Sequence, residues 1–204
     1  MSRKDIFKDY WMIKTASSTI DSPPGAYYQQ LYRKHYQGAW VRAGACFFMW
    51  LVALLAYCVD VIGQPNFIGV SITDLCLITM NPPALWVLKR IRHPLYLSMI
   101  STAINLLEIV GYTAVIYFLG GIEASYLTTI YAVLIAYVGA IDNHRKTFLI
   151  AGACAVFYAA MVLLEGGGLI PWFRINPHYD LMWSQRLAIL FTVISLQMLL
   201  AVIA

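Results

Sequence analysis

A row of polar side chains lies on one helical face of the apolar segment 95–119. Ser98, Ser101, Asn105, Glu108 and Tyr112 follow one another at steps of three and four residues, which puts them on the same side of an α-helix. A carboxylate in an apolar run is costly to bury and calls for a partner or a purpose. At about 1.5 Å per residue, Glu108 lies about 17 Å from the end of the segment, near the middle of a bilayer.

The preceding apolar segment carries a second polar face with Ser71, Asp74 and Asn81. By the same rise per residue, Asn81 lies at the depth of Asn105 in the bilayer, and Asp74 lies at the depth of Tyr112. Lipid cannot satisfy the hydrogen bonds of such side chains. We therefore expect the two faces to point toward each other or toward another helix.

Two interpretations of these faces stay open. The functional one is a polar pocket, open outward, that binds a small molecule or an ion. The structural one is hydrogen bonding between helices, worth about 0.6 kcal/mol a bond, and it suits the asparagines and serines. Glu108 favours binding, because a neutral residue would pack at lower cost. The candidate ligand contacts are Glu108, Asn105, Tyr112, Asp74, Asn81, Tyr131 and Gln197, the last two because they fall near Glu108 in depth.

The composition indicates the elements that must hold these residues. The 204-residue chain is 61% hydrophobic and 12% charged, which is typical of a membrane protein. A helix needs about 20 mostly apolar residues to cross the hydrocarbon, and six segments meet or approach this length. We predict an all-α, polytopic membrane protein. The expected spans are 43–62, 67–88, 95–119, 122–141, 147–164 and 187–204.

The distribution of Lys and Arg predicts the orientation. Twelve of the 14 basic residues fall before the first span, between spans two and three, or between spans four and five. The positive-inside rule puts these segments, and with them both termini, in the cytoplasm. Residues 1–42 are then a cytoplasmic lead with a juxtamembrane amphipathic helix, and 43–204 form the membrane domain. Since the sequence ends inside an apolar run, we expect a cytoplasmic output domain beyond residue 204.

The short turn between the third and fourth spans reads Gly120-Gly121-Ile122-Glu123. Glycine readily takes the left-handed conformation that ends a helix. Glu123 then falls in the first turn of the next helix, where the helix dipole favours a negative charge. We predict that Gly120, Gly121 and Glu123 form a structural turn that holds the two spans as a hairpin.

The stretch that begins at this turn resembles the membrane regions of bacterial sensor histidine kinases. The matching residues are Gly120, Gly121, Ile122, Ser125, Tyr131 and Ala136, although Glu123 and Ala124 stand where the family often continues with Ser-Pro-Phe. Six spans with a cytoplasmic C-terminus also resemble sensor modules fused to kinase, diguanylate cyclase or adenylate cyclase domains. The resemblance implies a signal-input domain in a bacterial inner (plasma) membrane, a small-molecule or lipophilic signal, and a homodimer.

The alternative is a small proton- or cation-coupled transporter or channel that uses Glu108 and Asp74. The sequence carries no catalytic motif of its own, so enzymatic activity would belong to the parent protein. The four cysteines form no CxxC pair and the four histidines show no ligand spacing, which predicts no metal site and no cofactor. The basic net charge follows from the membrane orientation and needs no nucleic-acid partner.

Overall fold

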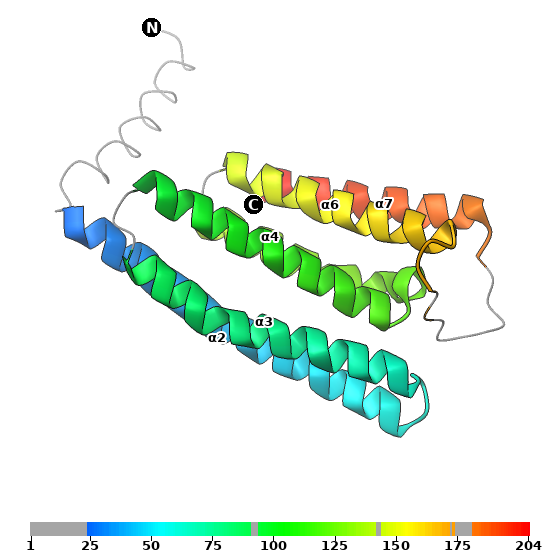
Figure 1. The fold of residues 1–204 in the computed structure, drawn as a ribbon. Coiled ribbons are helices and arrows are strands. Elements are labelled where there is room, and N and C mark those ends of the chain that lie inside the picture. Colours follow the sequence, from blue (N-terminus) through cyan, green and yellow to red (C-terminus); the bar gives the residue numbers. More distant parts are fainter. Residues whose placement is uncertain (1–23, 91–93, 142–143, 172, 174–180) are drawn as a thin grey trace, which may run out of the picture.

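The computed structural model of the chain describes residues 24–90, 94–141, 144–171, 173 and 181–204 (Figure 1). Six helices in this part are long and apolar enough to cross a membrane, where the 3₁₀ helix η1 and the helix α5 count together as one span. The predicted all-α class with six membrane-crossing helices is therefore confirmed. The elements are α2 (Pro24–Cys58), α3 (Gln64–Arg90), α4 (Pro94–Phe118), η1 (Gly121–Thr128), α5 (Thr129–Ile141), α6 (His144–Gly166) and α7 (Trp183–Ile203).

The first span differs from its expected bounds at both ends. The apolar part of α2 runs from Tyr36 to Cys58, and the boundary expected at residue 42 falls inside the continuous helix. The helix ends before Ile62 because Asp60 takes a left-handed backbone conformation with φ of 58°. Hydropathy could not show this end, since residues 59, 61 and 62 are as apolar as the span itself. Residues 1–23 of the expected lead lie outside the described part.

The fourth and sixth spans begin differently from the expectation, for local reasons. The fourth span begins as a 3₁₀ helix, and a regular α-helix starts only at Thr129. The sixth begins at Trp183, four residues before the apolar run. There the side-chain oxygen of Gln185 accepts a hydrogen bond of 3.0 Å from the backbone N–H of Met182, which caps the helix.

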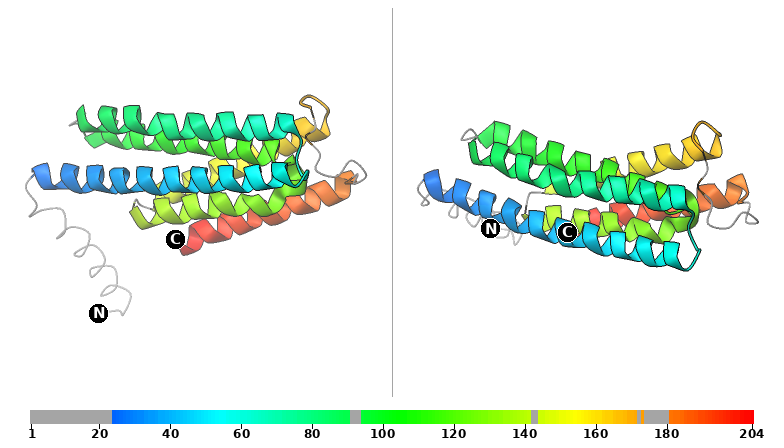
Figure 2. Two further views of the ribbon diagram at one scale, coloured as in Figure 1. Left: turned by 90° about the horizontal axis from the view of Figure 1, so that it is seen from below. Right: turned by 60° about the horizontal axis from the view of Figure 1, so that its bottom comes forward.

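The helices pack in two groups with α4 between them. Figure 1 shows the α2–α3 hairpin on one side of α4 and the pair α6 and α7 on the other side. The main apolar core joins α4, α5, α6 and α7, with Ile109, Tyr131 and Tyr158 among its fully buried side chains. Among the described elements, α2 packs extensively on α3 alone. Figure 2 shows that α2 nevertheless runs beside α5.

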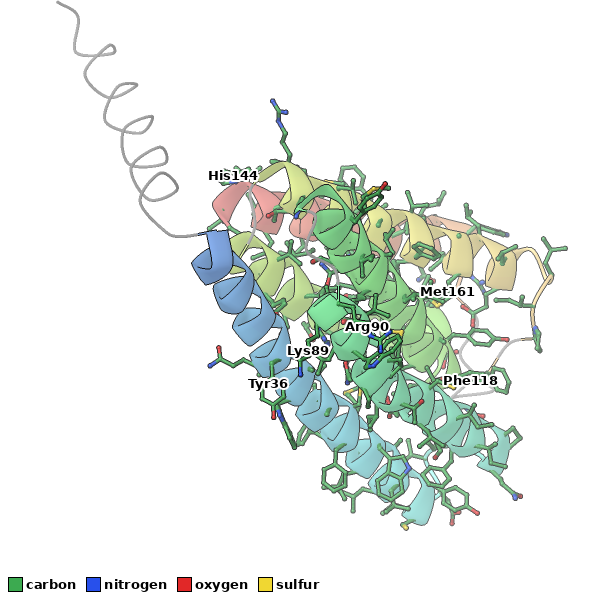
Figure 3. All side chains as sticks on the ribbon, turned by 60° about the vertical axis from the view of Figure 1, so that its left-hand side comes forward. Tyr36, Lys89, Arg90, Phe118, His144 and Met161 are labelled. Carbon is green, nitrogen blue, oxygen red and sulfur yellow. The ribbon has the colours of Figure 1, made fainter. Side chains whose placement is uncertain are left out.

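Basic residues gather at one end of the helices. Lys89 and Arg90 close α3, and His144, Arg145 and Lys146 open α6. Figure 3 shows Lys89, Arg90 and His144 at this common end, which is also where α2 begins and the described chain stops. The other end holds the turns that follow α2 and α4 and the described residues 167–171 that follow α6. The bundle therefore has one basic end, as the orientation argument requires.

Candidate functional site

A buried ion pair joins α2 to α4 within the membrane-crossing segments. Arg42 Nε lies 2.9 Å from Glu108 Oε1, and the two side chains are 11% and 2% exposed. Each ion alone would be costly to desolvate at this depth, and their mutual attraction offsets that cost. The carboxylate that the sequence singled out therefore has an arginine partner.

Asn81 brings α3 to the same pair. The Nε–H of Arg42 donates a hydrogen bond of 3.4 Å to Asn81 Oδ1. The hydrogen on Arg42 Nε points to the side-chain amide of Asn81. The contact of Arg42 with Glu108 is therefore an attraction between charges and not a second hydrogen bond from Nε. Two helices, α3 and α4, thus supply the polar contacts of Arg42 that the structure records.

The remaining polar residues of α3 and α4 are also buried. Asp74 and Asn105 are 3% and 5% exposed. Within the described ranges, Asp74 Oδ2 and Asn105 Oδ1 have no hydrogen-bond partner. Ser71 has a structural contact instead, since its hydroxyl accepts a hydrogen bond of 3.1 Å from Trp50 Nε1. The unpartnered atoms of Asp74 and Asn105 therefore fit the binding interpretation better, whereas Ser71 fits the structural one.

A pocket of about 290 Å³ opens between α2 and α5, with α4 as its floor; we call it the α2–α5 pocket. Most of its wall is apolar, and Arg42 and Glu108 supply its charges. Phe48 and Val133 belong to the lining and are 63% and 65% exposed, so the pocket has an open side toward the lipid-facing surface. Its lining consists of Gly38, Val41, Arg42, Ala45, Phe48, Met49, Glu108, Tyr112, Leu127, Thr129, Ile130, Val133, Leu134 and Tyr137.

The charged wall of the α2–α5 pocket has unused hydrogen-bonding capacity. In the part of the chain that the structure covers, Arg42 Nη1 and both carboxylate oxygens of Glu108 are buried without a hydrogen-bond partner. Buried polar atoms are nearly always paired with protein, water or a ligand. These atoms belong to two residues of the pocket wall, so a polar group of a ligand that reached them would supply the missing partners.

The structure brings only some of the expected ligand contacts to this pocket. Glu108 and Tyr112 line it, and Asn81 reaches it through Arg42. Tyr131 is fully buried in the apolar core, where its hydroxyl lies 2.6 Å from Thr113 Oγ1. Gln197 is buried on α7 and is not a lining residue. Equal depth therefore did not imply a shared site for these last two residues.

The glycine turn before η1 encloses a second buried carboxylate. Gly120 and Gly121 have φ of 117° and 58°, both in the left-handed region, and Glu123 lies in the first turn of η1. The backbone N–H of Ile122 donates a hydrogen bond of 3.4 Å to Glu165 Oε2 from α6. A Cβ at Gly121 would overlap the Glu165 carboxylate. The turn thus positions a negative charge at the start of a helix, where the dipole favours it.

Sequence reasoning missed Arg42 and Glu165. Arg42 was assigned to the cytoplasmic lead because the long run without a charged residue begins only at Ala43. A signal was present, since Gly38, Arg42, Ala45 and Met49 recur at helical spacing, and all four line the pocket. Glu165 was missed because a carboxylate at the end of a span is usually hydrated.

The described residues offer little for metal or redox chemistry. No group of three His, Cys, Asp or Glu side chains among them could hold a metal ion. Cys46 and Cys154 are buried as free thiols, and Cys58 and Cys76 are exposed ones. The chemistry available at the α2–α5 pocket is therefore hydrogen bonding and charge next to an apolar wall.

Comparison of the chain with protein-family models, with curated proteins and with solved structures gives no match.

Proposed function

We propose that this chain is the membrane-embedded signal-input domain of a bacterial receptor, and that it binds a lipophilic molecule in the α2–α5 pocket. The α2–α5 pocket with its buried ion pair carries the proposal. Ligand sites are mostly apolar cavities with a few convergent polar groups, and this pocket has that character. Its open side toward the surface of the spans provides a path of entry from the bilayer.

The packing supplies a route by which binding could reach α7. Tyr137 of α5 lines the pocket and lies against Gly38 of α2. Two residues further, a Cβ at Gly139 would lie 2.6 Å from the Cβ of Ala204, which follows α7. A ligand that draws α2 toward α5 therefore acts on a helix that also contacts the end of α7. Such a ligand biases the protein only by its different affinity for the two packings.

The proposal includes the orientation and assembly that the sequence suggests. The basic end of the helices faces the cytoplasm of a bacterial cell, following the positive-inside rule. An output domain such as a histidine kinase follows α7, and the receptor is a homodimer, as the resemblance to sensor kinases implies.

Filling the pocket tests the binding function. The purified chain in lipid nanodiscs is incubated with a lipid extract of bacterial cells and measured by native mass spectrometry. We expect a lipophilic molecule to remain bound to the unmodified chain. Ala45→Trp, in the pocket wall, should abolish binding because the indole occupies the cavity. Ala160→Trp, at an exposed position of α6 outside the lining, is the matched control and should leave it intact. Equal binding by both variants would rule out this pocket.

Proton-coupled transport is the second candidate, and one observation favours it. Asp74 is a buried carboxylate in the membrane interior in addition to Glu108. A transporter predicts proton flux in proteoliposomes that falls at least about tenfold in Asp74→Asn, since the amide cannot carry the proton. The input-domain proposal predicts no flux above that of empty liposomes for either protein.

A further inference from the structure

The charges on the wall of the α2–α5 pocket cancel each other. Arg42 and Glu108 are its ionised lining residues, and they stand 2.9 Å apart. A cationic head group beside Glu108 would meet the guanidinium at short range, and an anionic one beside Arg42 would meet the carboxylate. Both repulsions are strong where water is excluded. The pair therefore selects against charged head groups and leaves room for a neutral one.

The orphaned atoms define what the neutral group must do. Arg42 Nη1 is a donor without an acceptor, and Glu108 Oε2 is an acceptor without a donor, whereas Oε1 already lies 2.9 Å from Arg42 Nε. These partners are lacking among the residues that the structure describes. A hydroxyl group accepts one hydrogen bond and donates another, so a single oxygen satisfies both sides. An ether, ester or ketone oxygen has no hydrogen to donate to Glu108.

The rest of the pocket fits a single hydrocarbon chain. Its other walls include Ala45, Met49, Ile130 and Leu134, which offer only apolar contact. The volume of about 290 Å³ is at the small end of the range for ligand pockets, which favours a ligand with one chain. The open side at Phe48 and Val133 lets the end of a longer chain extend into the bilayer.

We propose that the α2–α5 pocket recognises a neutral, single-chain amphiphile whose head group is a hydroxyl. The hydroxyl donates a hydrogen bond to Glu108 and accepts one from Arg42 Nη1, and the chain lies along the apolar wall. This inference rests on the proposed binding function of the same pocket and adds the chemical class of the ligand.

Photolabelling with a matched set of probes tests the head group. The full chain in phosphatidylcholine nanodiscs is irradiated with four eight-carbon diazirine probes: an alkane, an alcohol, an alkylamine and an alkyl sulfate. Labelled residues are located by mass spectrometry. Labelling of the pocket wall is divided by labelling of Phe191, an exposed residue of α7, which corrects for partitioning into the bilayer. We expect the alcohol to label the pocket at least about tenfold more than each other probe, the ratio that one hydrogen bond to a charged group supplies.

A charge-free variant separates the head group from the chain. Arg42→Met with Glu108→Leu removes both ions together and keeps an apolar wall of similar volume, so no unpaired charge remains. In this double variant the alcohol should lose its advantage and label the pocket as the alkane does. An undiminished preference for the alcohol in the double variant would overturn the assignment of its partners.

The outcomes test the hydroxyl head group separately from the proposed binding of a lipophilic molecule in the α2–α5 pocket. Labelling of the pocket that is equal for the alkane and the alcohol, or strongest for a charged probe, overturns the hydroxyl while leaving a binding pocket. Pocket labelling no greater than that of Phe191 with every probe overturns the binding function itself. Unlabelled 1-octanol should compete with the alcohol probe. Competition by diacylglycerol but not by 1-octanol would overturn the single-chain class.

Discussion

Replacing Glu108 with leucine is expected to destabilise the protein by about 3–5 kcal/mol, the usual cost of leaving one member of a buried ion pair alone. The guanidinium of Arg42 cannot shed its proton, so it stays charged in the interior of the spans. Asn81 remains as a neutral acceptor and cannot replace the lost negative charge. The free energy of unfolding is measured by titrating the protein with SDS in mixed micelles.

Two further variants show whether pairing is the cause. Arg42→Met alone should cost less than Glu108→Leu, because an unpartnered carboxyl can take up a proton and become neutral. Arg42→Met combined with Glu108→Leu should return to within about 1 kcal/mol of the original stability, since no ion is then buried. If the double variant is as unstable as the sum of the single ones, shape and not charge pairing holds these helices.

The six helices were predictable because lipid leaves a chain few choices. Every backbone polar group must be satisfied within the segment, so a long apolar run forms a helix. Helix ends were less predictable, since they depend on backbone conformation and capping. Asp60 ends α2 by its left-handed conformation although apolar residues continue to Ile62, and Gln185 starts α7 by a hydrogen bond four residues before the apolar run.

The partner of Glu108 was harder to predict than Glu108 itself. Arg42 lies 16 residues before the end of α2, about 24 Å along the helix, while Glu108 lies about 15 Å from the end of α4. By distance along the helices alone, Arg42 and Glu108 lie at different depths and would not be expected to meet. The long arginine side chain bridges part of this difference. A rule that counts basic residues near span ends also assigns Arg42 to the solvent, although its side chain faces the pocket.

The pocket could not be predicted from periodicity. Helical spacing shows which residues share a face, and it placed Glu108 and Tyr112 on the face that lines the pocket. It does not show how far apart two helices stand, and the pocket exists because α2 packs on α3 and leaves space beside α5. Tyr131 shares the depth of Glu108 but faces the core, where Thr113 pairs with it.

A substitution in the glycine turn that follows α4 is expected to have the second large effect on stability. Gly121→Ala should lower the free energy of unfolding by about 3 kcal/mol. A left-handed conformation costs a residue with a Cβ roughly 1–2 kcal/mol. The new methyl group also displaces the Glu165 carboxylate from its contact with the Ile122 N–H, and a disturbed buried polar group costs about 1–3 kcal/mol more.

Gly168 provides a matched control for the backbone part of this effect. It has φ of 70°, close to that of Gly121, but a Cβ there meets no atom within 4 Å. Gly168→Ala should therefore cost only the roughly 1–2 kcal/mol of backbone strain. In a protein that already carries Glu165→Ala, the methyl group of Gly121→Ala has open space. Gly121→Ala should then lower the free energy of unfolding only by as much as Gly168→Ala does. Equal losses for Gly121→Ala and Gly168→Ala in the presence of Glu165 would show that the carboxylate yields freely, and that this turn is held by its backbone alone.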